Sequence, residues 1–169
     1  MRLDTTLLKL AGLAALTGAA LRLATAFPNL PIPGLTSEAI YFAIDLLLTL
    51  GLIGLFAGTA RFRTWLGAVG FAGALAGFEL IRTGERLGGA QAYQNSSTIL
   101  GLSLAVAGLA LAKGRGLARY AGAAWLVSLA VGLAGTLAHR PAGFLVASLF
   151  FCLGFVLGGL ALLKGPEAT

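Results

Sequence analysis

The sequence predicts an all-helical membrane protein, a bundle of six transmembrane helices, and three observations lead to this fold class. Of its 169 residues, 58% are hydrophobic and only 11% are charged, with a mean hydropathy of +0.92. A soluble domain carries roughly 25% charged residues, so too little polar surface remains here to coat a water-soluble globule. The apolar residues also form runs of about 20, the length that a helix needs to cross a bilayer. Turn-forming residues punctuate those runs.

We expect the six spans to form one integral membrane domain that covers residues 1–169. They are predicted at Leu7–Phe27, Ala39–Thr59, Thr64–Ile81, Tyr93–Ala112, Leu117–Ala138 and Ala142–Leu163.

The breaks between the spans contain residues that interrupt helices. PNLPIPG, at Pro28–Gly34, cannot continue a helix because its three prolines lack backbone donors and have a fixed φ. Thr36 or Ser37 then caps the second span, and Glu38 in its first turn faces the positive end of the helix dipole. The later breaks are RTGERLGG at Arg82–Gly89, KGRG at Lys113–Gly116 and HRPAG at His139–Gly143.

The basic residues predict the orientation. With both termini in the cytoplasm, the inner segments hold Arg2, Lys9, Arg61, Arg63, Lys113, Arg115, Arg119 and Lys164, and the outer segments hold Arg82, Arg86 and Arg140. Eight against three follows the positive-inside rule. These residues stand singly between apolar runs, so the net charge of +6 does not indicate nucleic-acid binding.

The predicted location is the cytoplasmic (inner) membrane of a bacterium, because YFAIDLLLTLGLIGLFA is typical of small bacterial membrane proteins. Arg2, Lys9 and the later ATA at Ala24–Ala26 also resemble a signal peptide with its cleavage site. The apolar stretch is long for a signal peptide and Arg22 interrupts it, so we interpret it as the first span.

The chain carries a weak threefold repeat. Gly12, Gly67 and Gly122 are 55 residues apart, and each opens a span that runs outward. The six spans are therefore candidates for three helical-hairpin repeats, although glycine, alanine and leucine are common enough in membrane helices to produce short matches by chance.

Glycines spaced four apart predict close helix packing. The pairs are Gly54/Gly58, Gly73/Gly77 and Gly154/Gly158. The main interpretation is packing within the bundle. The alternative is association with another copy, or with a larger membrane complex, through the same glycine-rich faces.

The polar residues of the spans gather in their predicted outer halves, whereas the inner halves are nearly pure Leu, Ala, Gly, Val and Phe. Glu38, Tyr41, Asp45 and Thr49 form one stripe along the second span. Arg22 lies ten residues before Ile32, the midpoint of the first outer loop, and Asp45 thirteen after it. We therefore predict that Arg22 and Asp45 form an ion pair at similar depth.

These residues predict a binding site in the outer half for a small amphiphilic, lipid-like ligand, with a base rich in Phe and Leu. The expected ligand-binding residues are Arg22, Tyr41, Asp45, Glu79, Arg82 and Tyr93. Ionisable groups within spans generally indicate a functional site. The alternative is that Arg22–Asp45 and Glu79–Arg82 are only structural clamps between helices.

Several function classes are disfavoured by what the chain lacks. One histidine and one cysteine, Cys152, leave no conventional zinc site, bis-histidine haem or disulfide, so no cofactor and no metal are predicted. His139 is interpreted as interfacial, and Cys152 with Ser148 as core packing.

Three hypotheses for the function remain. The chain is a protein that binds or moves an amphiphile, an accessory subunit of a membrane complex, or an enzyme for an apolar terpenoid or lipid with Asp45 and Glu79 as acid and base.

Overall fold

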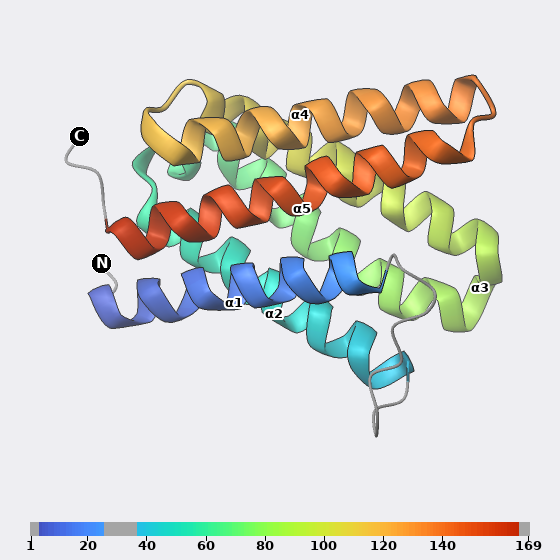
Figure 1. Ribbon diagram of the computed structural model, residues 1–169, viewed down its shortest axis with the longest axis horizontal. Helices are drawn as coiled ribbons and strands as arrows, with labels where there is room; N and C mark the ends of the chain where they lie inside the picture. The colour runs from blue at the N-terminus through green and yellow to red at the C-terminus, as the bar shows by residue number, and fades with distance from the viewer. Residues whose placement is uncertain (1–3, 26–36, 166–169) are drawn as a thin grey trace.

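The computed structural model describes residues 4–25 and 37–165. Figure 1 shows a bundle of helices, and no strand occurs in the described ranges. The elements are α1 (Thr5–Ala24), α2 (Ser37–Gly58), the short 3-10 helix η1 (Ala60–Arg63), α3 (Trp65–Ala112), α4 (Gly116–Leu137) and α5 (Pro141–Lys164).

The predicted fold class is confirmed. Within the described residues, six helical segments are long and apolar enough to cross a membrane, so the chain is compatible with an integral membrane protein. They are Thr5–Ala24, Glu38–Gly58, Trp65–Thr83, Ala92–Ala112, Gly116–Leu137 and Ala142–Lys164. The outward surface is also apolar: Trp65 is 77% exposed and Leu137 83% exposed.

The predicted break at Arg82–Gly89 separates two spans, as expected. It is shorter than the segment predicted, because α3 stays helical up to Gly89, whose φ of 64° and ψ of −155° are not helical. The first helix ends at Ala24 rather than at Phe27, and Phe27 and the predicted cap Thr36 lie outside the described residues. Glu38 lies in the first turn of α2, as expected.

The break at Gly89 divides α3 into a first arm (Trp65–Thr83) and a second arm (Ala92–Ala112). The arms run antiparallel, because Gly77 approaches Leu100 while Gly70 approaches Ala107. In the same way α1 pairs with α2, and α4 pairs with α5. The described residues thus form three antiparallel helix pairs, and the proposed 55-residue sequence repeat stays a prediction.

The bundle has two ends that differ in packing. We call the end with Lys9 and Lys164 the terminal end, and the end with Gly89 and His139 the hairpin end (Figure 1). The closest contacts between different helix pairs lie toward the terminal end. A Cβ on Gly12 of α1 would lie 2.8 Å from the carbonyl oxygen of Gly159 in α5, and one on Gly108 would lie 2.7 Å from that of Gly122.

The predicted glycine pairs pack within the chain. Gly54 faces Ala11, Gly73 faces Ser103, and Gly158 faces Leu55, each at a distance that leaves no room for a Cβ. This packing supports the intramolecular interpretation. Association with another copy or a larger complex stays a prediction.

The core fills the middle of the bundle and its terminal half. Its largest fully buried side chains include Leu52, Leu55, Phe62, Trp125 and Phe155. The rings of Trp125 and Phe155 meet edge to face with centroids 5.2 Å apart, which fixes the α4–α5 pair internally. These side chains fill the terminal half around the α4–α5 pair.

Candidate functional site

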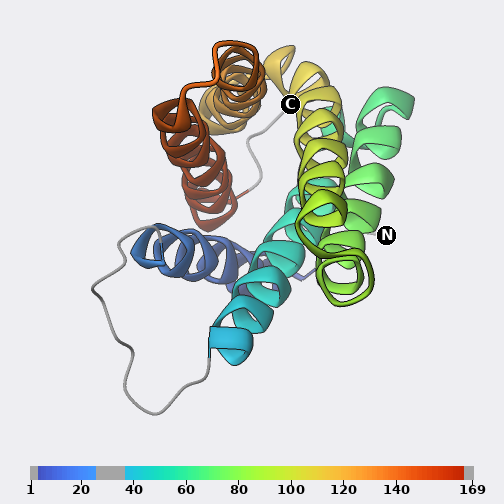
Figure 2. The ribbon, with the colours of Figure 1, turned by 90° about the vertical axis from the view of Figure 1, so that its right-hand side faces the viewer.

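A cavity of about 1420 Å³ opens among the three helix pairs. Viewed from the hairpin end, the pairs surround one central region (Figure 2). The lining residues are Arg22, Glu38, Tyr41, Phe42, Ile44, Asp45, Leu48, Phe78, Glu79, Ile81, Arg82, Thr83, Gly89, Tyr93, Gln94, Ser97, Thr98, Leu100, Gly101, Ser128, Leu129, Gly132, Leu133, Thr136, Phe144, Ala147, Ser148 and Phe151. Every long helix of the described chain therefore contributes to the wall.

The cavity follows from how the helices diverge. Among the described elements, α3 makes no close backbone contact with α5, and α2 makes none with α4. The helices are instead held through α1–α5 and α3–α4 contacts, where glycine pairs let the backbones meet. The cavity opens where these contacts between helix pairs are absent.

The structure brings all six predicted ligand-binding residues to the wall of this one cavity. Arg22 comes from α1, Tyr41 and Asp45 from α2, and Glu79, Arg82 and Tyr93 from the two arms of α3. Of the predicted stripe on α2, Glu38 also lines the cavity, whereas Thr49 is not among the lining residues.

The predicted Arg22–Asp45 ion pair was wrong. Although both residues are described and both line the cavity, no nitrogen of Arg22 lies within 4.0 Å of an Asp45 carboxylate oxygen. The guanidinium of Arg22 instead lies 6.0 Å from the centre of the Tyr41 ring. Arg22 and Asp45 therefore line the same cavity but do not contact each other across it.

Arg82 does form an ion pair, with Glu79 on its own helix, at 3.4 Å. The two side chains are 38% and 70% exposed, so the pair contributes about 0.5 kcal/mol or less to stability. The Arg82 guanidinium also lies 4.5 Å from the centre of the Phe42 ring of α2. Such a cation–π contact contributes about 0.5–1 kcal/mol. The predicted Glu79–Arg82 clamp therefore lies within α3 and does not join two helices. The contact from Arg82 to another helix is the one with Phe42, which the sequence did not predict.

Asp45 is the half-buried carboxylate of the cavity wall. Arg22, Glu79 and Arg82 line the same cavity. Asp45 forms no ion pair with any described residue. A carboxylate among apolar helices needs polar partners, and here an open space faces it.

The base of the cavity is apolar, as the sequence predicts. Ile44, Leu48, Phe78 and Leu100 line it and are buried in the core. Phe151 lines it as well and packs on Phe155, with ring centroids 5.2 Å apart. The cavity therefore combines charged groups with a base of aromatic and branched side chains.

Sequence reasoning missed the wall supplied by α4 and α5. Ser128, Gly132 and Thr136 follow one another at intervals of four on α4 and all line the cavity. That spacing was a usable signal for one helix face. The expectation for α5 was half right, since Cys152 is fully buried but Ser148 lines the cavity.

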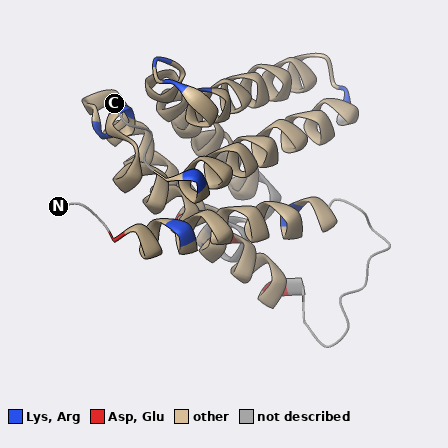
Figure 3. Ribbon diagram, turned by 60° about the vertical axis from the view of Figure 1, so that its left-hand side comes forward, with Lys and Arg blue, Asp and Glu red and all other residues tan. Residues whose placement is uncertain are grey.

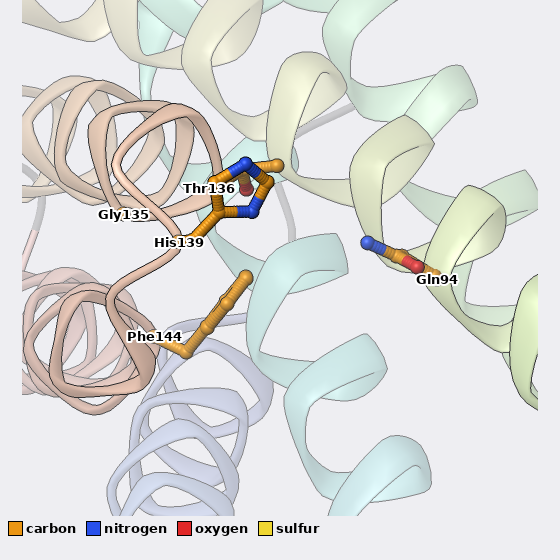
Figure 4. Close-up of a pocket in the computed structure, with 5 residues that line it drawn as sticks. All are labelled: Gln94, Gly135, Thr136, His139 and Phe144. Atoms are coloured by element: carbon orange, nitrogen blue, oxygen red, sulfur yellow. The ribbon is translucent and has the colours of Figure 1, made fainter.

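A smaller pocket of about 310 Å³ adjoins the cavity between α3 and the α4–α5 turn. Figure 4 shows its five lining residues, Gln94, Gly135, Thr136, His139 and Phe144. Gln94, Thr136 and Phe144 also line the large cavity, so the pocket is a side extension of it. His139 is exposed at the turn with a φ of 51°, and its interfacial position stays a prediction.

The charges of the two ends differ. Among residues whose side chains are described, the terminal end carries the acid Asp4 and seven basic residues, Lys9, Arg61, Arg63, Lys113, Arg115, Arg119 and Lys164 (Figure 3). The hairpin half carries three of each sign: Arg22, Arg82, Arg140, Glu38, Asp45 and Glu79.

Within the described residues, no group of three His, Cys, Asp or Glu side chains could hold a metal ion. The chain matches no protein-family model, no curated protein and no solved structure.

Proposed function

We propose that this chain is an integral membrane protein that binds one amphiphilic molecule in the cavity. The polar head would lie among the charged residues, and the apolar part on the Phe- and Leu-rich base. The observation that carries this proposal is the lining of one cavity by Arg22, Asp45 and Arg82 together with Phe78 and Phe151.

The size of the cavity favours a ligand with a long apolar part. Sites for small molecules occupy roughly 300–1,000 Å³, whereas this space is about 1420 Å³. Ionisable groups in membrane helices are costly, and they persist where a function or a water-filled cavity requires them. The unpaired Asp45 and Arg22 fit that requirement.

The charge distribution supports the proposed orientation, with the terminal end in the cytoplasm of a bacterium and the cavity toward the outer side. Seven basic residues against one acidic residue stand at the terminal end among the described side chains. This is the asymmetry that the positive-inside rule requires.

Binding is better supported than movement across the membrane. A transport path would have to pass the terminal half, where Leu55, Phe62 and Trp125 are buried. The backbones of Gly12 and Gly159 also meet there.

The experiment fills the cavity without touching its charges. A Cβ on Gly101 meets only Leu129 Cδ1 at 3.8 Å, so Gly101→Leu adds volume to the cavity wall. The control is Ala123→Leu, on an exposed position of α4. The proteins are gently solubilised, and their bound lipids are identified by native mass spectrometry. We expect Gly101→Leu to lose the bound amphiphile and Ala123→Leu to retain it. Equal retention by both variants would contradict the proposal.

A second candidate function is acid–base catalysis on an apolar substrate. The observation that favours it is that Asp45 and Glu79 line the same cavity in different surroundings, one half-buried and unpaired, the other exposed and paired with Arg82. Two carboxyl groups in unlike environments can act as acid and base. Incubation with a terpenoid or lipid extract tests this by product analysis. Loss of conversion in Asp45→Asn with unchanged lipid retention would favour catalysis.

A further inference from the structure

We infer that the head of the bound amphiphile carries a negative and a positive group together, as phosphoethanolamine does. This inference rests on the proposed function and specifies its ligand class. The carrying observation is that Arg22 and Asp45 line one half-buried space, have opposite charges and do not pair with each other.

Arg22 has donors to offer a ligand. Among the described residues no carboxylate lies within 4.0 Å of it, and its guanidinium lies 6.0 Å from the centre of the Tyr41 ring. A guanidinium has five N–H donors in a planar fork that matches phosphate geometry. The Tyr41 ring occupies one side of the guanidinium, so the donors along its edge stay free for an anion.

The Asp45 carboxylate, in contrast, requires a hydrogen-bond donor from a ligand. The Asp45 side chain forms no ion pair and no hydrogen bond with the described residues, although it is half-buried on the cavity wall. An ionised carboxylate only accepts hydrogen bonds, so its partner must be a donor. An alkylammonium group supplies three donors and the compensating charge.

The other charged residues at this depth do not supply these partners. Arg82 pairs with Glu79 at 3.4 Å and lies over the Phe42 ring, and it forms no ion pair with Asp45. A ligand that is only anionic would satisfy Arg22 and leave Asp45 unpaired beside a like charge. A ligand that is only cationic would do the reverse, and one bipolar head satisfies both.

The separation of the two charges supports this view. Opposite charges in poorly hydrated surroundings attract strongly and gain by direct contact. Here they stay more than 4.0 Å apart, on adjacent helices of one pair. A ligand head with both charges could contact each of them without bringing the two side chains together.

The test uses the full chain in detergent with three probes. Dioleoyl phosphatidylethanolamine has a head with a negative phosphate and a positive ammonium group. Dioleoyl phosphatidylglycerol has the same acyl chains, but its head carries only the negative phosphate. Glycerophosphoethanolamine has the bipolar head and no acyl chains. Retention is measured by native mass spectrometry during titration. We expect the ethanolamine lipid to bind about tenfold more tightly than the glycerol lipid, as one charge-assisted contact would give.

The variants separate the two contacts. Arg22→Gln should weaken both lipids about tenfold, and Asp45→Asn should weaken only the ethanolamine lipid, to the level of the glycerol lipid. Arg22→Lys and Asp45→Glu, which keep the charge, should retain part of the preference. Arg140→Gln and Asp4→Asn are matched controls, because neither residue lines the cavity and both are exposed.

The outcomes distinguish this inference from the proposed function. Equal binding of the two lipids to the unmodified protein, with no selective effect of Asp45→Asn, overturns the bipolar head. The proposed function then stands if Gly101→Leu still lowers retention of both lipids, and it falls if no lipid is retained at all. Competition by glycerophosphoethanolamine as strong as by the lipid supports the bipolar head and identifies a free compound as its source.

Discussion

Gly12 and Gly159 cross so closely that a Cβ on Gly12 would lie 2.8 Å from the carbonyl oxygen of Gly159. A Cβ on Gly159 would in turn lie 2.7 Å from the carbonyl oxygen of Gly12. This crossing joins α1 to α5, the first and last helices of the described chain, near the terminal end. The two backbones are in close contact at the terminal end, whereas the cavity lies toward the hairpin end.

The crossing predicts that Gly12→Ala destabilises the protein. The new Cβ would meet backbone, which cannot move as a side chain can, and overpacking of this kind costs about 1–3 kcal/mol. Gly132→Ala is the control, because its Cβ would meet Ala147 Cβ at an ordinary 3.5 Å. Thermal unfolding in detergent should show a lower Tm for Gly12→Ala alone. An unchanged Tm would mean that α1 and α5 do not cross at this point.

The absence of an Arg22–Asp45 ion pair predicts a small energetic coupling between them. Breaking a buried ion pair costs about 3–5 kcal/mol, whereas unpaired residues facing a cavity should couple by less than about 1 kcal/mol. A double-mutant cycle with Arg22→Gln and Asp45→Asn, measured by reversible unfolding in mixed micelles, gives this energy. A coupling above about 2 kcal/mol would restore the clamp interpretation.

The sequence predicts the spans well, because run length and composition decide whether a helix can cross a membrane. It also places the break between the third and fourth spans at Arg82–Gly89, but not the extent of that break, because this polar stretch stays helical until Gly89. Arg, Glu and Leu are good helix formers, so polarity alone did not end the helix there.

The sequence predicts the level along the helices at which the site residues lie. It does not predict the rotation of each helix about its axis, which decides which side chains meet. Counting from the loop midpoint places Arg22 and Asp45 at one level, and both line the same cavity. Their pairing depends on how α1 rotates, and contacts with α5 such as Gly12–Gly159 set that rotation. Ser128 was missed for another reason: its hydroxyl donates to the carbonyl oxygen of Ala147 at 2.8 Å, and serines that bond to backbone are common in membrane helices.

The proposed orientation predicts which end faces the outside of the cell. In a background with Cys152→Ala, single cysteines replace two exposed alanines, Ala60 at the terminal end and Ala138 at the hairpin end. A membrane-impermeant maleimide added to intact bacterial cells should label Ala138→Cys and leave Ala60→Cys unlabelled until the membrane is broken. The reverse pattern would invert the orientation and place the cavity on the cytoplasmic side.

The turn of α3 predicts a backbone effect at Gly89 that does not depend on contacts. Its φ of 64° and ψ of −155° lie in a region that only glycine adopts readily. Nothing lies within 4 Å of a Cβ built there, so Gly89→Ala should lower the free energy of unfolding by about 1–3 kcal/mol through backbone strain alone.

Gly101→Ala makes the same chemical change within a regular part of α3, where a Cβ meets Leu129 Cδ1 at 3.8 Å. Replacing a helical glycine by alanine stabilises by about 0.5–1 kcal/mol, so the two substitutions should shift the free energy of unfolding in opposite directions. Equilibrium unfolding of both variants in the same detergent measures the difference. Equal shifts would show that the chain does not turn sharply at Gly89, and the antiparallel packing of the two arms of α3 would then need another connection.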